Sequence, residues 1–163
     1  MNKTQLILGL LLLMGAGYLL NNFILVSPEQ KIIRQLDNLA SVIQKLPQDS
    51  NIKKAAQISS FGGYFTPDVA VSIAHPRGNT TSSSRAEIIN QFKGFKGYDS
   101  IHTLKVAWGP ATVEFDNENK NKAKVTTSII ADHNGQTEWL NAPVNLTFIR
   151  ENNSWKISSI QSP

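Results

Sequence analysis

The first apolar feature of the chain is an uncharged run that covers residues 5–26. A helix of this length reaches about 33 Å at ~1.5 Å rise per residue, which exceeds the roughly 30 Å of a bilayer's hydrocarbon core. We therefore expect a single-pass membrane anchor at residues 1–26 and a folded domain at residues 27–163. A cleaved signal peptide is the alternative, because Lys3 gives a positively charged start and residues 15–17 are small. We expect the domain on the extracytoplasmic (periplasmic) side, because so short an N-terminal tail is readily retained in the cytoplasm.

The next apolar positions recur at spacings of three and four, the period of a helix that packs on one face. They predict an amphipathic helix that Ser27 caps and Pro47 ends. A shorter helix capped by Asp49 or Ser50 follows, and a third is capped by Ser84. The apolar faces expected on these three helices are Ile32, Leu36, Leu39, Ile43 and Leu46; Ile52, Ala55 and Ala56; and Ile88, Ile89, Phe92 and Phe95.

In the second half of the chain the apolar period falls to two, as in half-buried strands. Asn134-Gly135 favours a tight hairpin, because both residues tolerate the positive φ angles of a type I′ turn. Helices first and strands last predict an α+β fold in which helices cover one face of an antiparallel sheet. The strands are expected at residues 69–73, 101–108, 111–115, 123–132, 137–150 and 155–160.

The order of these elements and several local strings resemble the nuclear transport factor 2-like superfamily. The resemblance implies a curved antiparallel sheet wrapped around about three helices in a cone-shaped α+β domain, with an apolar pocket at its wide end. It also implies frequent homodimers through the sheet, and it covers enzymes as well as plain binding domains. The strings that carry it are the helices Glu29 to Leu46 and Arg85 to Phe95, the junction Tyr64 to Val69, and the closing hairpin Pro143 to Phe148 with Trp155 to Ile157.

Charge and composition limit the classes of partner that the chain is expected to bind. The 163-residue chain carries a net charge of +4, which falls to +3 without Lys3 and the rest of the anchor. No basic stripe is present, so we expect no nucleic-acid partner. Lys93, Lys96 and the group Lys120, Lys122 and Lys124 are interpreted as solvated charges, for which anionic lipid headgroups fit better than nucleic acid. The absence of cysteine excludes disulfide scaffolds, zinc fingers and thiol catalysis.

The resemblance also tells which catalytic groups to look for. An isomerase-like member needs a carboxylate base on its first strand and a tyrosine donor on its first helix, to stabilise an enolate. The stretch Val71 to His75 has no carboxylate, and the first helix has no tyrosine. The chain therefore departs from the isomerase pattern at both positions.

Two histidines remain as candidate general bases. His75 follows the first strand, where such pockets open, although a histidine before a proline is typical of a solvent-facing turn. His102 is expected to share a strand face with Leu104, Val106 and Trp108, although histidines there more often complete a core or rim. The expected ligand-binding residues are Tyr64, His102, Trp108 and Trp139. The three histidines lie 27 and 31 residues apart, so we expect no metal site, and no cofactor motif appears.

Two functions follow from this pattern. The first is a membrane-anchored, non-catalytic domain that binds a small apolar ligand or a protein partner. The alternative is a membrane-tethered cyclase, dehydratase or isomerase-like enzyme with His75 or His102 as the general base. An enzyme should bring one of these histidines within reach of Tyr64, Asp68 or Glu138. A binding domain should instead fill its interior with side chains such as Ile32, Leu36, Phe65 and Phe92.

Overall fold

The computed structural model describes residues 26–74, 79–98 and 100–163. Residues 32–163 form one compact unit. The described residues contain no helix of the length and apolarity needed to cross a membrane. Except for Val26, the predicted anchor at residues 5–26 lies outside them.

The helices are α2 (Pro28–Ile43), α3 (Asn51–Phe61) and α4 (Arg85–Gly97), with a short 3-10 turn, η2 (Gly62–Tyr64). Each helix begins at a predicted cap, and in α3 the cap is Ser50 rather than the alternative Asp49. The backbone N–H of Gln30 donates to Ser27 Oγ at 3.2 Å, and Ser50 Oγ and Ser84 Oγ accept equivalent bonds in α3 and α4. Such caps satisfy backbone donors that the first turn of a helix leaves without a partner.

α2 ends at Ile43, three residues before the predicted end at Leu46. Lys45 leaves the helix because its backbone pairs with Leu104 in a β-bridge. The N–H of Lys45 donates to the Leu104 carbonyl at 2.9 Å, and the N–H of Leu104 returns a bond of 2.8 Å. The chain after α2 is therefore fastened to the start of the strand that follows α4.

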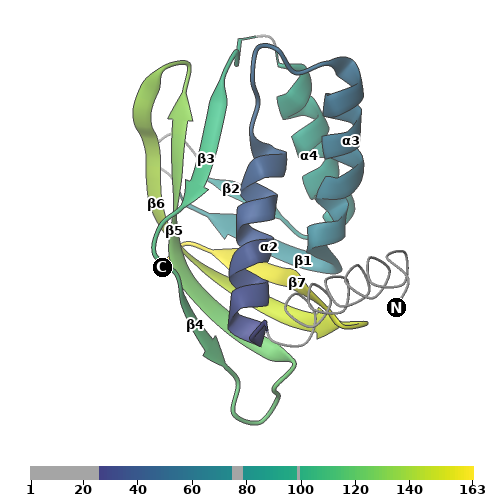
Figure 1. Ribbon diagram of the computed structural model, residues 1–163, viewed down its shortest axis with the longest axis vertical. Coiled ribbons are helices and arrows are strands. Elements are labelled where there is room, and N and C mark those ends of the chain that lie inside the picture. The colour runs from purple at the N-terminus through teal and green to yellow at the C-terminus, as the bar shows by residue number, and fades with distance from the viewer. Residues whose placement is uncertain (1–25, 75–78, 99) are drawn as a thin grey trace, which may run out of the picture. The chain divides into compact units, whose positions relative to one another are not determined.

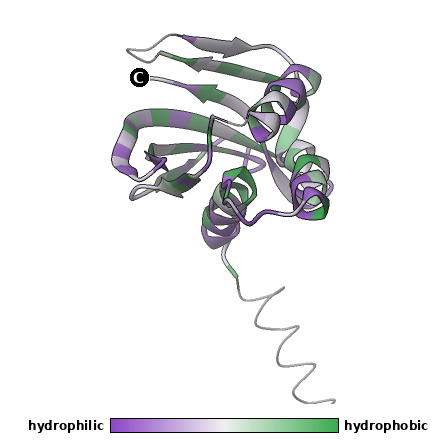
Figure 2. Cartoon of the chain, turned by 90° about the horizontal axis from the view of Figure 1, so that it is seen from above, coloured by the Kyte–Doolittle hydropathy of each residue, from purple (hydrophilic) through white to green (hydrophobic). Residues whose placement is uncertain are grey.

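The strands are β1 (Phe65–Ile73), β2 (Thr80–Ser82), β3 (Leu104–Trp108), β4 (Thr112–Phe115), β5 (Lys122–His133), β6 (Gln136–Glu151) and β7 (Ser154–Gln161). They form a curved sheet in the order β2-β1-β7-β6-β5-β3, and β4 pairs with another part of β5. The strands show alternating apolar and polar bands, as expected for a sheet with one covered face (Figure 2). The predicted hairpin is present, with φ of 48° at Asn134 and 83° at Gly135.

The prediction of a wholly antiparallel sheet is wrong, because β1 and β7 pair in parallel and the sheet is mixed. In this pair Ala70 lies opposite Ser159 and Val71 opposite Ile160. A sequence pattern can indicate which strands are paired through a hairpin. β1 and β7 are far apart in the chain, so nothing local indicates that they pair. The sequence therefore predicted the strands but not this pairing.

α2 packs its apolar stripe against the concave face of the sheet (Figure 1). Ile32, Leu36 and Leu39 are at most 1% exposed. Burying each such side chain stabilises the fold by roughly 1.5–3 kcal/mol. The strand residues of this core are Ala123 and Val125 of β5, Val144, Leu146 and Phe148 of β6, and Trp155, Ile157 and Ile160 of β7.

α3 and α4 lie side by side and pack on each other (Figure 1). The predicted stripe of α4 is confirmed: Ile88 and Phe92 are buried, and its other two members pack against the core. The predicted face of α3 is wrong, because Ile52 is 84% exposed and the helix buries Gln57 and Phe61 instead. Because Gln57, one turn before Phe61, is polar, the spacing of apolar residues does not indicate this buried face.

Candidate functional site: an apolar cleft and a polar cluster beside it

An apolar cleft of about 270 Å³ opens beside α4. An empty apolar cavity of about 150 Å³ can hold benzene, so this volume suits a ligand of about two fused rings. Gln91 is the polar side chain among its lining residues, and it is exposed. The lining residues are Ile43 from α2, Phe61 from α3, Leu104 from β3, and Ile88, Gln91, Phe92 and Phe95 from α4.

Three phenylalanine rings form an aromatic wall in this cleft. The Phe61 and Phe92 rings stack with centroids 3.9 Å apart, and the Phe92 and Phe95 centroids are 6.0 Å apart. No carboxylate or imidazole of the described residues lines the cleft. Its chemistry is therefore that of apolar contact and ring stacking, with Gln91 as one hydrogen-bonding group at the edge.

The interior between α2 and the sheet is filled by side chains. Ile32, Leu36, Phe65 and Phe92 all belong to the buried core, and each is at most 6% exposed. The cleft is thus a recess at the side of this core, where Phe92 forms both core and wall. Of these four side chains, only Phe92 also lines the cleft.

A buried lysine closes one end of this region. Lys96, only 2% exposed, follows Phe92 by one turn of α4. Its ammonium donates to Gln57 Oε1 at 2.9 Å, to the Ile43 carbonyl at 3.3 Å, and to the Gln44 carbonyl. The same nitrogen lies 5.1 Å from the centre of the Phe92 ring. Every hydrogen of this ammonium therefore has an acceptor, which a buried charge requires.

The position of Lys96 has an electrostatic explanation. α2 has no basic residue in its last turn, so its final carbonyls lack a cation of their own helix. Lys96 of α4 supplies that cation, because its ammonium binds the carbonyls of Ile43 and Gln44 where the helix dipole is negative. Desolvation lowers the pKa of Lys96 to about 8, although the nearby Asp49 carboxylate opposes this shift.

Two further charged residues are buried beside Lys96. The Asp49 carboxylate accepts from the N–H of Leu46 at 2.9 Å and pairs with the Lys53 ammonium at 2.6 Å. Desolvation opposes ionisation of Asp49, but these bonds and the nearby ammonium groups lower its pKa overall. The Lys45 ammonium donates to the Tyr98 carbonyl at 2.6 Å. Lys45, Asp49, Gln57 and Lys96 are called the helix-end cluster below.

Of the two candidate bases, His75 lies outside the described residues, and His102 is exposed. The prediction that His102 shares a strand face with Leu104 is wrong, because β3 begins only at Leu104. Asn134 Oδ1 accepts from the N–H of His102 at 2.9 Å and from that of Thr103 at 3.0 Å, which holds this segment at the hairpin. No hydrogen bond or ion pair of the described residues joins His102 to Tyr64, Asp68 or Glu138.

The predicted ligand-binding aromatic residues lie at separate places. Tyr64 is half-buried in η2, and burial raises its pKa. The Trp108 indole N–H donates to the Leu36 carbonyl at 2.7 Å and so holds β3 to α2. The Trp139 ring lies 5.1 Å from that of His133 at the β5–β6 hairpin. None of Tyr64, His102, Trp108 and Trp139 is among the residues that line the cleft.

Within residues 26–74, 79–98 and 100–163, no three His, Asp or Glu side chains lie close enough together to hold a metal ion. The site is therefore described by its apolar wall and its helix-end cluster.

The arrangement of helices and strands is shared with solved structures of other proteins. A putative scytalone dehydratase from Novosphingobium aromaticivorans matches with a TM-score of 0.63 and 14% identity, over 82% of this chain and 80% of that chain. The ActVI-ORFA protein of Streptomyces coelicolor matches with a TM-score of 0.58 and 9% identity, over 82% of this chain and 93% of that chain. The Kfla4162 protein of Kribbella flavida matches with a TM-score of 0.62 and 13% identity, over 82% of this chain and 88% of that chain.

The chain has the nuclear transport factor 2-like fold. No family model matches the sequence, and no curated protein matches it. At 9–14% identity the structural likeness shows the fold alone, and this fold carries both enzymes and binding domains. The function therefore has to be argued from the cleft.

Within the nuclear transport factor 2-like fold, sequence reasoning missed the helix-end cluster. Lys96 was interpreted as a solvated charge, but it is buried. The signal was present, because Ile88, Phe92 and Lys96 follow one another at intervals of four and continue one helix face. The exposed Lys93, three residues earlier, lies off this face.

Proposed function

We propose that this domain binds a small apolar, aromatic ligand in the cleft beside α4 and does not transform it. The observation that carries the proposal is the lining, where three phenylalanines and three aliphatic residues face a space with one amide at its edge. Binding of planar ligands by stacking requires only such a surface. General acid–base catalysis requires titratable groups at the same place.

The proposal is tested by filling the cleft. Ile43→Trp places an indole in the cleft from the end of α2, where Ile43 is only partly buried. The matched control is Ile130→Trp, because Ile130 is also partly buried but lies on β5, outside the cleft. The probe is 2-naphthol, and binding is followed by the chemical shifts of backbone amides.

We expect 2-naphthol to shift the amides of α4 in the natural chain and in Ile130→Trp, and not in Ile43→Trp. Equal binding by both variants would show that the probe binds elsewhere and would contradict the proposal. Chemical conversion of a bound hydroxylated ring compound, lost in His75→Gln, would support the enzyme function instead.

We also propose that residues 5–26 tether the domain to a membrane, as their uncharged apolar run supports. A tether raises the effective concentration of a binding domain at its surface. Fractionation of the full chain tests this, because a shortened, fully soluble mature product would contradict it. A homodimer through the outer face of the sheet stays a prediction, which sedimentation of the purified chain tests.

A further inference from the structure

The positive charge of the domain is concentrated in its two packed helices, α3 and α4. Together they carry five basic side chains and one acidic side chain, Glu87. Residues 104–161, which include β3 to β7, carry six basic and six acidic side chains. This segment is thus neutral, and the excess positive charge lies on α3 and α4.

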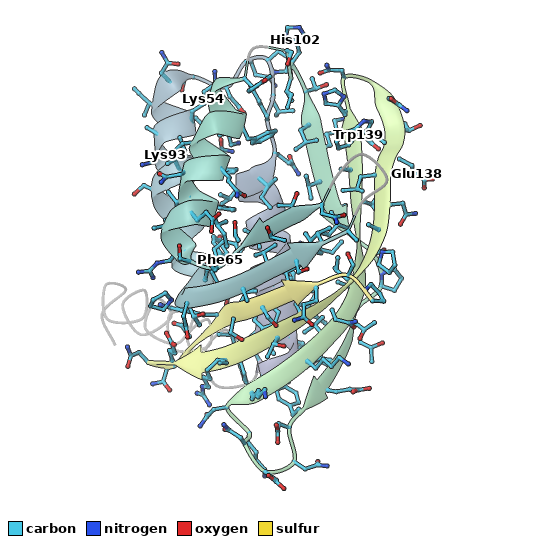
Figure 3. All side chains as sticks on the ribbon, turned by 180° about the vertical axis from the view of Figure 1, so that it is seen from behind. Lys54, Phe65, Lys93, His102, Glu138 and Trp139 are labelled. Atoms are coloured by element: carbon cyan, nitrogen blue, oxygen red, sulfur yellow. The ribbon has the colours of Figure 1, made fainter. Side chains whose placement is uncertain are left out.

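The ammonium groups of Lys54 in α3 and Lys93 in α4 form no ion pair and no side-chain hydrogen bond within the part of the chain that the structure describes. Lys54 is half-buried and Lys93 is exposed, and both lie on the α3–α4 side of the molecule (Figure 3). Lys53 beside them is half-exposed even though it pairs with Asp49. The one acidic residue, Glu87, is used near the start of α4, where it accepts from the N–H of Ser83.

The two most exposed large apolar side chains of the described residues lie in the same helical layer. Ile52, in the first turn of α3, is 84% exposed, and Tyr98, at the end of α4, is 64% exposed. The bond from Lys96 of α4 to Gln57 of α3 joins the two helices in this region, and the charges of Lys53 and Lys54 in the first turn of α3 act on Lys96. Asp99, the next residue in the chain, lies outside the described residues.

We propose that this α3–α4 patch (Ile52, Lys53, Lys54, Lys93 and Tyr98) docks the domain on the surface of an anionic lipid bilayer. Exposed aliphatic and aromatic side chains enter the headgroup region, where tyrosine is favoured, while lysines bind the anionic headgroups. Each lysine near such a surface strengthens binding roughly five-fold. Three lysines and two apolar side chains give weak, reversible docking, which suits a chain held at the membrane by other means.

An acidic protein is the competing partner for a basic surface. The observations favour lipid because the most exposed side chain of the patch, Ile52, is aliphatic and does not belong to the residues that line the apolar cleft. Protein interfaces bury such a residue in a complementary pocket, whereas a bilayer accepts it without one.

The absence of cysteine makes a direct test straightforward. Single substitutions Ile52→Cys and Ala107→Cys in the full chain each give one attachment point for a polarity-sensitive fluorophore. Both positions are exposed, and Ala107 lies on β3, away from the patch. The labelled chains are combined with vesicles of equal parts phosphatidylglycerol and phosphatidylcholine, or of phosphatidylcholine alone.

We expect a blue shift of the label at position 52 with anionic vesicles only, and none at position 107. Lys54→Gln with Lys93→Gln should lower the ratio of docked to undocked protein about 30-fold. The matched pair Lys120→Gln with Lys124→Gln removes the same charge from the β4–β5 side and should leave the ratio within about two-fold. High salt should reverse the docking.

Three results would overturn the proposal. Equal shifts at positions 52 and 107 would mean that the whole domain is merely near the membrane. A shift that is equal with both lipids would remove the role of the lysines. A shift that grows with protein concentration without vesicles would show that a second copy of the chain covers the patch. None of these results depends on whether the cleft binds a ligand.

Discussion

The interface of α2 with the sheet and the interface of α3 with α4 are built in different ways. Ile32, Leu36 and Leu39 meet the sheet with apolar side chains, and the Trp108 indole adds a hydrogen bond to the Leu36 carbonyl. Between α3 and α4, apolar contact at Phe61 and Phe92 gives way at the next turn to the bond between Gln57 and Lys96. The first interface contains no buried charge among the described residues, so its stability comes mainly from apolar burial. The second depends in addition on a hydrogen-bond geometry and a protonation state, so the two should respond differently to substitution and to pH.

The largest effect is expected from Leu36→Ala, at the centre of the apolar interface. Leu36 is 1% exposed, and truncation of a buried leucine removes transfer free energy and leaves a cavity. We expect the free energy of unfolding in urea to fall by about 2–5 kcal/mol. Ile52→Ala, a truncation at an exposed site, should change it by less than about 0.5 kcal/mol. A loss below 1 kcal/mol at Leu36 would show that the core can collapse onto the site.

Lys96→Met tests the second interface. Methionine keeps most of the side-chain volume but leaves Gln57 Oε1 and the α2 carbonyls without their donor. We expect a loss of about 1–3 kcal/mol in urea unfolding at neutral pH. Adding Gln57→Leu should recover part of it, since replacing both partners is less costly than removing one. Lys93→Met is the matched control and should be neutral, whereas equal effects at both lysines would contradict a special role for Lys96.

These two interfaces also explain what the sequence could and could not predict. The stripes of α2 and α4 follow from apolar spacing, and the serine caps from local chemistry, so both were predicted correctly. Gln57 and Lys96 each continue a buried helix face, but each is polar, and the bond between them helps to satisfy both when they are buried. A pattern read one helix at a time cannot show such a mutual dependence.

Two further features could not be predicted from the sequence, for one shared reason. They are the parallel pairing of β1 with β7 and the end of α2 at its bridge to Leu104. Each depends on a partner far away in the chain, which local periodicity does not report. The cleft belongs to this class as well. Phe92 and Phe95 were predicted on the buried stripe of α4, whereas Phe61 was not predicted, and the structure shows that the three rings line a recess among four elements.

The pH dependence of stability should separate the two interfaces. The pKa of Lys96 is about 8 in the folded chain, against 10.5 for an ordinary lysine, so below pH 8 the folded state bears the full cost of the desolvated ammonium. Between about pH 8 and 10.5 the folded state releases this proton while the unfolded state keeps it. The free energy of unfolding of the natural chain should therefore rise with pH relative to Lys96→Met, by at most about 1.4 kcal/mol per pH unit.

This comparison is made in urea at several values between pH 7 and 10. The charged groups around Lys96 are Asp49, Lys45, Lys53 and Lys54, and the lowered pKa of Asp49 acts only on the acid side of the range. Tyr64, whose pKa burial raises, is present in both chains and cancels in the difference. A difference that stays flat with pH would show that the acceptors of Lys96 hold its proton against desolvation.

The smallest effect is expected at His102, and it bears directly on the function. His102 is exposed at the end of the loop before β3, and Asn134 is bonded to its backbone N–H rather than to its imidazole. His102→Gln should therefore change the affinity of the cleft for 2-naphthol by less than about two-fold, which is less than one typical hydrogen bond contributes. The 2-naphthol titration that is used for Ile43→Trp also measures this change in affinity. A ten-fold or larger loss of affinity would show that His102 contacts the ligand. The cleft would then contain the titratable group that its apolar wall lacks, and the enzyme function would be favoured over binding alone.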